Sequence, residues 1–184
     1  LQTREGPLKV EVARYTEAAL ERIPTTGALG KELRVLREAV VDGAITTNYD
    51  GLLEYLFPEF KAFVGQDELL FSDVQGVVEI YKIHGSATRP ESLILTERDY
   101  DGFNNRNPYL AAKLVTIFVE HPIVFLGYSL SDPDVTDLLV SVAQVLTTEN
   151  LRRLSDRLIF IQWDPSRAPS LTSTQIAVSG FSIP

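Results

Sequence analysis

The strongest restriction on the fold comes from short apolar segments rich in β-branched residues, three of which end in a polar turn that contains glycine. The segments that predict strands are residues 44–46, 77–83, 93–96, 123–126, 158–163 and 176–178. Each has the length of a strand rather than of a helix, and patterns with helical spacing lie between several of them. This alternation predicts a doubly wound α/β fold built on a mostly parallel sheet.

Helices are predicted where apolar residues recur at a spacing of three and four. One begins at Gly30-Lys31 and ends near Gly43, a second covers residues 50–57, a third begins at Asn107-Pro108, and a fourth covers residues 132–146. Asparagine followed by proline is typical of a helix start. No element is predicted for residues 61–73. At 184 residues, the length is that of a single domain covering residues 1–184.

Composition excludes several functional classes. The formal net charge is −8, which disfavours broad binding to nucleic-acid backbones. There is no cysteine and there are only two histidines, so we expect neither disulfides nor a zinc site. No apolar stretch approaches the ~20 residues that span a bilayer, and no signal peptide opens the sequence. We therefore expect a cytoplasmic protein that binds no membrane.

Polar residues follow two of the predicted strands at the edge where α/β sheets bind ligands. The first turn runs from Thr46 to Gly51 and contains Asn48 and Asp50. A simple alternative is that one of these two side chains caps the next helix. The second turn contains His84, which is alternatively a surface or hydrogen-bonded structural residue.

A third polar turn begins at Gly127 and contains Ser129. A glycine turn with a helix cap explains this pattern equally well. However, glycine followed by hydroxyl groups and a helix start is also how α/β proteins hold ribose and phosphate. Together the three turns supply a glycine, an asparagine, an acid and a histidine at one sheet edge, which suits nucleotide chemistry without a metal.

The order of these motifs resembles that of a known family. Residues 46–50 resemble the Thr-Gln-Asn-Ile-Asp motif of sirtuins, His84-Gly85 their catalytic His-Gly, and residues 127–130 their Gly-Thr-Ser-Leu motif. The residues of these motifs, together with Leu-Thr-x-x-Asp-Tyr at residues 95–100, are more similar still to the bacterial SIR2-like domains of antiphage defence proteins. The resemblance implies a Rossmann-like three-layer fold with a central, mostly parallel sheet, as in the large domain of sirtuins.

The resemblance also implies an activity and roles for single residues. Members of this family bind NAD+ and break the bond between nicotinamide and ribose. By position, Asn48 would orient the ribose and water, Asp50 would contact the nicotinamide carboxamide, and His84 would be the general base. An imidazole can accept a proton near pH 7. Gly127 and Ser129 would hold the adenosine ribose and the phosphates.

Two departures from the sirtuin pattern separate the subfamilies. The four-cysteine zinc module is absent, which disfavours protein deacylation or ADP-ribosyl transfer. Thr46 and Thr47 belong to the implied cofactor-binding set, but Thr47 replaces glutamine and Tyr49 replaces isoleucine. The family's Gly-Ala-Gly-x-Ser phosphate loop is also absent. Residues 27–30, Gly-Ala-Leu-Gly, do not replace it, because no predicted strand precedes them. We expect that this loop lies upstream of Leu1 in a longer protein.

The resemblance thus implies an NAD+ hydrolase that releases nicotinamide and ADP-ribose, as the effector domain of a bacterial antiviral defence protein that acts by abortive infection. The alternative is a catalytically inactive module that binds NAD+ or ADP-ribose for regulation or assembly. A homo-oligomer, other domains of the same chain and a phage-derived trigger are partners implied by the resemblance alone.

Overall fold

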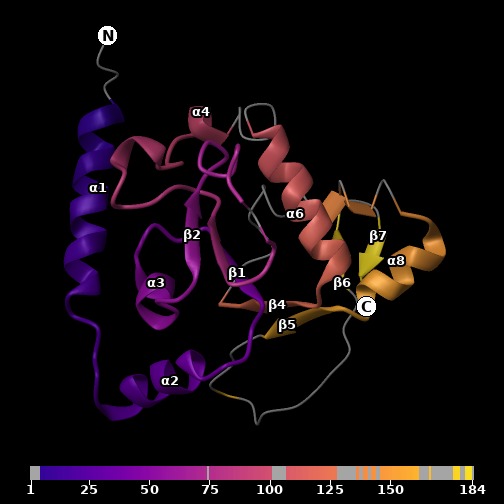
Figure 1. The fold of residues 1–184 in the computed structure, drawn as a ribbon, viewed down its shortest axis with the longest axis horizontal. Helices are drawn as coiled ribbons and strands as arrows, with labels where there is room; N and C mark the ends of the chain where they lie inside the picture. The colour runs from indigo at the N-terminus through magenta and orange to yellow at the C-terminus, as the bar shows by residue number, and fades with distance from the viewer. Residues whose placement is uncertain are drawn as a thin grey trace. The chain divides into compact units, whose positions relative to one another are not determined.

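The computed structural model describes residues 5–73, 75–100, 107–127, 146–161, 176–178 and 181–183, with residues 136, 139–140, 142–143 and 166. By its internal contacts the chain divides into two compact units, Leu1–Gly102 and Phe103–Pro184 (Figure 1). Among the described residues, no helix is both long and apolar enough to cross a bilayer.

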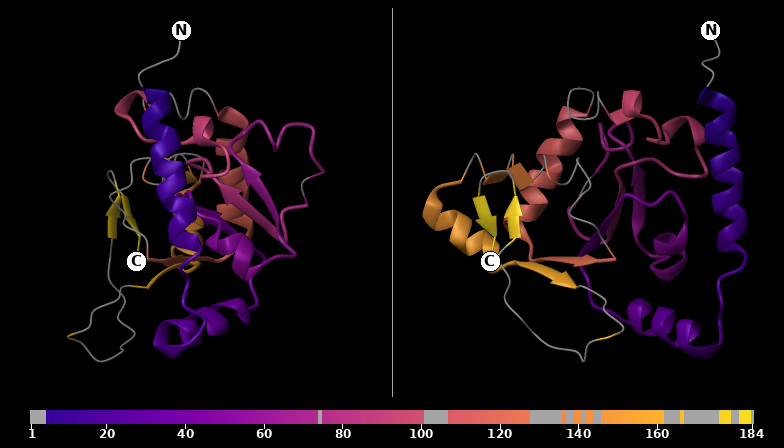
Figure 2. Two further views of the ribbon diagram at one scale, coloured as in Figure 1. Left: turned by 90° about the vertical axis from the view of Figure 1, so that its left-hand side faces the viewer. Right: turned by 180° about the vertical axis from the view of Figure 1, so that it is seen from behind.

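The first unit contains a small parallel sheet with helices before and between its strands. Its strands are β1 (Gly43–Thr46), β2 (Lys61–Val64) and β3 (Glu79–Lys82). Its helices are α1 (Glu5–Leu20), α2 (Gly27–Arg37), α3 (Leu52–Leu56), the 3-10 turn η1 (Pro90–Ser92) and α4 (Glu97–Tyr100). Helix α3 connects β1 to β2, and the loop from β2 to β3 extends outward from this unit (Figure 2).

Strand β3 lies in the middle of this sheet, in the order β1-β3-β2, and both pairings are parallel. Thr46 of β1 and Val64 of β2 both pair with Lys82. The carboxyl ends of all three strands therefore lie in register at one edge. In an α/β sheet this is the edge where ligands bind.

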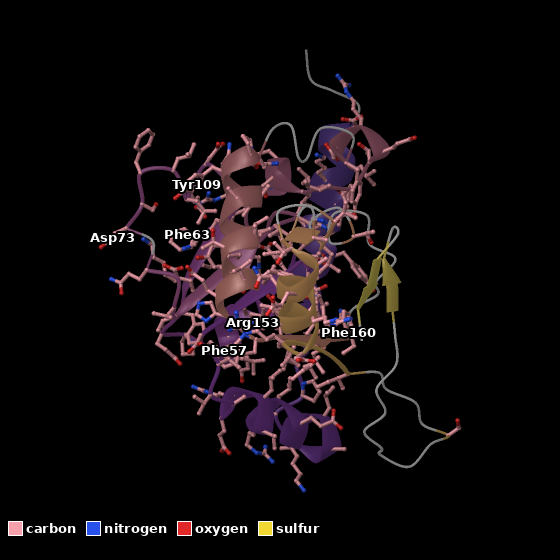
Figure 3. All side chains as sticks on the ribbon, turned by 90° about the vertical axis from the view of Figure 1, so that its right-hand side faces the viewer. Phe57, Phe63, Asp73, Tyr109, Arg153 and Phe160 are labelled. Carbon is pink, nitrogen blue, oxygen red and sulfur yellow. The ribbon has the colours of Figure 1, made fainter. Side chains whose placement is uncertain are left out.

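The core of the first unit forms where α3 and β2 pack around the central strand. Leu56, Phe63 and Ile80 are almost completely buried, and burying side chains of this size stabilises a fold by about 1.5–3 kcal/mol each. Figure 3 shows Phe63 inside this unit and Asp73 at its outer edge. These buried side chains hold the three strands in place, and with them the turns at their carboxyl ends.

The second unit is organised around a parallel pair of strands. Its described elements are α6 (Pro108–Glu120), β4 (Ile123–Leu126), α8 (Thr148–Ser155), β5 (Leu158–Ile161), β6 (Ile176–Val178) and β7 (Phe181–Ile183). Strands β4 and β5 are parallel, whereas β6 and β7 are antiparallel. Phe125 and Phe160 stack across the parallel pair with ring centroids 4.1 Å apart, and Phe118 of α6 meets Phe125 edge-on.

The α/β Rossmann-like fold predicted from the sequence is confirmed by these parallel strands and their helices. The predicted strands at 44–46, 77–83, 123–126, 158–163 and 176–178 correspond to β1, β3, β4, β5 and β6, and the predicted helices at 30–43, 50–57 and 107 onward correspond to α2, α3 and α6. Of the helix predicted at 132–146, the described residues 136, 139–140 and 142–143 are helical. The others lie outside the described residues, apart from Leu146, which is in a bend.

One predicted strand is wrong, and several elements were not predicted. Residues 93–96 are not a strand, because the Ile94 N–H donates to the His84 carbonyl and the Ile94 carbonyl accepts from the Tyr49 hydroxyl instead of joining a ladder. Helix α1 and strand β2 were missed: α1 buries only Ala13, and β2 is a four-residue strand that begins with an exposed lysine.

Candidate active site

The turn after β1 places the first group of predicted site residues. The Asn48 N–H donates to Thr46 Oγ1 at 3.0 Å, and the Leu52 N–H donates to Asp50 Oδ1 at 2.9 Å. The N-cap residue of α3 is Gly51, without a side-chain capping bond, and Asp50 instead bonds two residues ahead to the start of the helix. Thr47 is half-buried in the same turn, and Asn48 is exposed. Within the described part of the chain, Asn48 is therefore accessible to solvent.

The turn after β3 contains His84, which is buried rather than at the surface. The side chain of His84 is held in the interior, with the residue only 2% exposed. The ring of Tyr100 meets the imidazole edge-on, with centroids 5.4 Å apart. The His84 carbonyl accepts a hydrogen bond from the Ile94 N–H at 3.0 Å. Contacts to both the backbone and the ring of His84 therefore fix its position.

Glycine is required directly after this histidine. Gly85 has φ +94°, and a Cβ added there would lie 2.3 Å from the Ser92 carbonyl oxygen. The Ser86 N–H donates to Ser92 Oγ at 3.0 Å, and Ser92 Oγ donates to the Arg89 carbonyl at 2.6 Å. A side chain at position 85 would force this turn apart.

The two turns are joined to each other by backbone hydrogen bonds. The Ile83 N–H donates to the Thr46 carbonyl at 3.0 Å, and the Ala87 N–H donates to the Tyr49 carbonyl at 2.8 Å. The Asn48 turn and the His84 turn therefore form one continuous structure at the carboxyl edge of the sheet.

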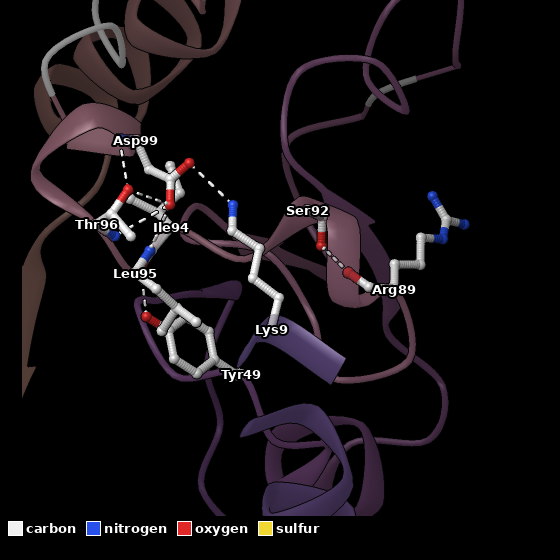
Figure 4. A network of polar contacts seen from close by, with 8 residues as sticks. All are labelled: Lys9, Tyr49, Arg89, Ser92, Ile94, Leu95, Thr96 and Asp99. Carbon is white, nitrogen blue, oxygen red and sulfur yellow. Dashed lines mark hydrogen bonds and ion pairs between the residues drawn. The ribbon is translucent and has the colours of Figure 1, made fainter. Parts of the chain in front are cut away.

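A third segment, residues 95–100, follows Ile94, whose carbonyl accepts a hydrogen bond from the Tyr49 hydroxyl of the first turn (Figure 4). Asp99 accepts hydrogen bonds from the Leu95 and Thr96 N–H groups, each at 3.0 Å, and its carboxylate pairs with Lys9 of α1 at 2.9 Å. Burial raises the pKa of Asp99, but the hydrogen bonds from Lys9 and the two backbone groups, with the charge of Lys9, lower it to about 2 from the usual 3.8. Asp99 therefore stays ionised and holds the segment that carries Tyr100.

Beneath the first turn lies a charged contact that sequence analysis did not identify. Lys82 is 1% exposed, and its Nζ lies 2.8 Å from Glu54 Oε1 and also donates to the Asp50 carbonyl. The only signal in the sequence is a lysine in a predicted strand that also contains Glu79. Its partner stands 28 positions away, and no local pattern identifies such a pairing.

The third predicted turn belongs to the second unit. Gly127 follows β4 directly and has φ +63°, a left-handed conformation that suits glycine. Ser129 lies outside the described residues. The structure therefore brings together Thr46, Thr47, Asn48, Asp50 and His84, all in the first unit. The ribose and phosphate roles of Gly127 and Ser129 stay predictions.

Metal ligands do not gather in the part of the chain that the structure describes. No group of three or more histidine or carboxylate side chains there is placed to hold an ion. The chemistry available at the strand edge is instead that of one amide, one carboxylate and one imidazole, which can orient a polar substrate and accept a proton.

Parallel strands with helices between them define this chain as an α/β protein of the Rossmann-like class. Comparison with known families is more specific. A family model described as "SIR2-like domain" matches residues 42–178, and the chain belongs to this family. The matched range contains every predicted site residue.

Curated relatives carry names that concern NAD+ and defence. The chain is 25% identical over 132 residues to "NAD(+) hydrolase ThsA" of Cytobacillus dafuensis, covering 68% of this chain and 26% of that protein. It is 28% identical over 131 residues to "Defense-associated sirtuin 2" of Bacillus subtilis, covering 66% and 12%. It is 24% identical over 144 residues to "NAD(+) hydrolase ThsA" of Bacillus cereus (strain MSX-D12), covering 76% and 30%. The chain thus spans less than a third of each relative.

Proposed function

We propose that this chain is the NAD+-hydrolysing domain of a bacterial antiviral defence protein, and that it cleaves NAD+ to nicotinamide and ADP-ribose. The observation that carries the proposal is the joined pair of turns after β1 and β3, which holds Asn48 and His84 at one sheet edge. Family membership and the names of the relatives support the same activity.

In the proposed reaction, the bond between the nicotinamide nitrogen and the ribose anomeric carbon breaks, and the electron pair leaves with nicotinamide, which becomes neutral. The ribose carbon becomes oxocarbenium-like and is attacked by water. The Asn48 side chain orients the ribose and this water, and His84 accepts the proton that the water loses. NAD+ and water thus give nicotinamide, ADP-ribose and one proton. A base of this kind contributes about 10²–10⁴-fold to rate.

The wider role is part of the proposal. NAD+ is the substrate and no metal takes part. Depletion of NAD+ in the cytoplasm during infection would stop phage growth by abortive infection. A phage-derived trigger, further domains of the same chain and a homo-oligomer are the partners proposed for such an effector.

One observation favours a second candidate, a catalytically inactive module that binds NAD+ or ADP-ribose. His84 is 2% exposed, so its imidazole reaches a substrate only if the site opens around it. A binding module has no need for such opening. Activity with an intact His84 therefore separates the two candidates.

The test uses the intact parent protein, with and without phage infection of its host, and measures free nicotinamide released from NAD+. His84→Ala should lower the rate by at least about 100-fold and leave NAD+ binding by calorimetry nearly unchanged, because a base acts mainly in the transition state. His121→Ala, at the other histidine in the sequence, is the matched control and should retain full activity. Undiminished nicotinamide release by His84→Ala would remove His84 as the base. NAD+ binding without any release by the wild type would establish the binding module.

A further inference from the structure

Lys82 is the one buried lysine among the described residues. It ends the central strand β3, two positions before His84, and its side chain is 0% exposed. Its Nζ has two acceptors, Glu54 Oε1 at 2.8 Å and the carbonyl oxygen of Asp50. Both acceptors lie across the sheet edge, on the turn after β1 and on the helix α3 that follows it. One side chain therefore connects the His84 strand to the Asn48 turn.

The cost of this arrangement argues against a purely stabilising role. The Lys82 side chain is 0% exposed and the Glu54 side chain is 33% exposed, so the pair is part-buried and the loss of hydration falls mainly on the ammonium. Removing a charge from water is unfavourable, and replacement of a buried ion pair by apolar residues is often neutral or stabilising. Glu54 Oε2 is buried and has no hydrogen-bond partner in the described structure, so the pair is incompletely compensated. An apolar contact would hold α3 on the sheet equally well, but it would not hold a carbonyl at a defined position.

That carbonyl belongs to a residue of the proposed site. The Asp50 carboxylate binds the first turn of α3 through the Leu52 N–H, while its carbonyl is held by Lys82. Thr46 at the other end of the turn is held by the Ile83 N–H. Between these two anchors stands the exposed Asn48.

We infer that Lys82 is a positioning residue that fixes the Thr46–Asp50 turn, and thereby Asn48, relative to His84. The inference rests on the proposed function for its catalytic consequence but not for its structural one. Without the Lys82 contact the turn keeps its backbone bonds at Thr46 and Tyr49 but loses the contact that holds the Asp50 carbonyl. A misplacement of about 1 Å can cost 10²-fold in rate, so the loss should appear in kcat more than in KM.

The experiment uses the intact parent protein with two variants, Lys82→Met and Lys82→Met/Glu54→Leu, because the single change leaves Glu54 without its partner. Lys61→Met is the matched control, since Lys61 is an exposed lysine on the neighbouring strand β2. Three quantities are measured: the melting temperature, the hydrogen exchange of peptides covering residues 46–57, and kcat and KM for nicotinamide release.

We expect the double variant to melt within a few degrees of the wild type, to exchange the amides of Leu52 and Tyr55 at least tenfold faster, and to lose about 10²-fold in kcat. Lys61→Met should match the wild type in all three. Unchanged exchange in residues 46–57 would overturn the inference, even if the parent protein hydrolyses no NAD+. Faster exchange with full kcat would overturn its catalytic part. If neither variant folds, Lys82 is a stability residue and the inference is wrong.

Discussion

The strands β3 and β4 invert the usual relation between polarity and burial. Strand β3 contains Glu79 and Lys82, yet all four of its residues are at most 3% exposed. Strand β4 is entirely apolar, yet Val124 and Leu126 are 53% and 59% exposed. Burial in this chain is therefore set by position within a sheet, and the polar groups of a buried strand must be satisfied by specific partners.

Those partners are visible for both charged residues of β3. Glu79 accepts hydrogen bonds from the Gln75 and Gly76 N–H groups and from the Tyr81 hydroxyl. Strand β3 also has a neighbour on each side, whereas β4 pairs with β5 alone among the described residues. The first unit therefore depends on directed polar contacts at its strand ends, and the described part of the second unit depends on aromatic packing.

The largest expected difference between the regions comes from the glycines that follow their strands. Gly85→Ala should destabilise the protein by about 3 kcal/mol, because a left-handed residue is strained and its Cβ would collide with the Ser92 carbonyl. Gly127→Ala should cost only about 1 kcal/mol, because its φ is also positive but, among the described residues other than its chain neighbours, no atom lies within 4 Å of the added Cβ. Urea denaturation of both variants provides the comparison. Equal costs would show that the Ser92 contact relaxes freely.

The second expected effect is a pH dependence of the first unit. Because the pKa of Asp99 is lowered to about 2 from 3.8, its stabilisation is fully present above pH 3.8 and is lost as the pH falls through about 2. From this shift, Asp99→Asn should be less stable than the wild type by on the order of 2 kcal/mol near neutral pH.

Urea titrations at several pH values between about 2 and 7 check this prediction. The difference between wild type and Asp99→Asn should shrink as the pH falls below 3.8. Glu97→Gln, at an exposed carboxylate in the same helix, is the control and should show no such trend. A difference that stays constant down to about pH 2 would show that Asp99 stabilises the chain without its charge.

Much of the fold was predictable because most of its strands lie in short segments rich in apolar and β-branched residues, separated by patterns with helical spacing. Burial was not. The apolar segment 123–126 is typical of a central strand covered on both faces, but the structure leaves alternate residues of β4 exposed. Conversely, the two charges in residues 79–82 indicate a half-exposed strand. Glu79 is satisfied by Tyr81 of its own strand and by the preceding loop, and Lys82 by the Asp50 turn and α3. Periodicity carries no information about such partners.

The candidate site likewise has features that the sequence predicts and features that it does not. The positions of Asn48 and His84 followed from the rule that ligands bind at strand carboxyl ends, and the structure joins their turns. The burial of His84, its contact with Tyr100 and the Lys82–Glu54 pair depend on contacts between separate segments. Sequence could predict candidate residues for the site, whose roles stay predictions, but not the contacts that hold them in place.

A smaller expected effect tests the aromatic packing of the second unit. The rings of Phe125 and Phe160 are nearly parallel, at 4° and 4.1 Å between centroids. A double-mutant cycle with Phe125→Leu and Phe160→Leu should give a coupling energy of about 0.5–1.5 kcal/mol, independent of pH. Denaturant titration of the four proteins measures it. Zero coupling would mean that the two rings contribute only through the area that each buries.

The smallest effect removes one or two methyl groups from each strand. Ile80 is 0% exposed, so Ile80→Val should cost about 0.5–1.5 kcal/mol through the lost burial and the small cavity. Val124→Ala removes more carbon from a residue that is 53% exposed, and it should cost less than about 0.5 kcal/mol. Measurement of both by urea denaturation at the same pH gives the ordering. If Val124→Ala proves the more costly, the outer face of β4 is covered in solution, and the contrast between the two strands reduces to the polar contacts of β3.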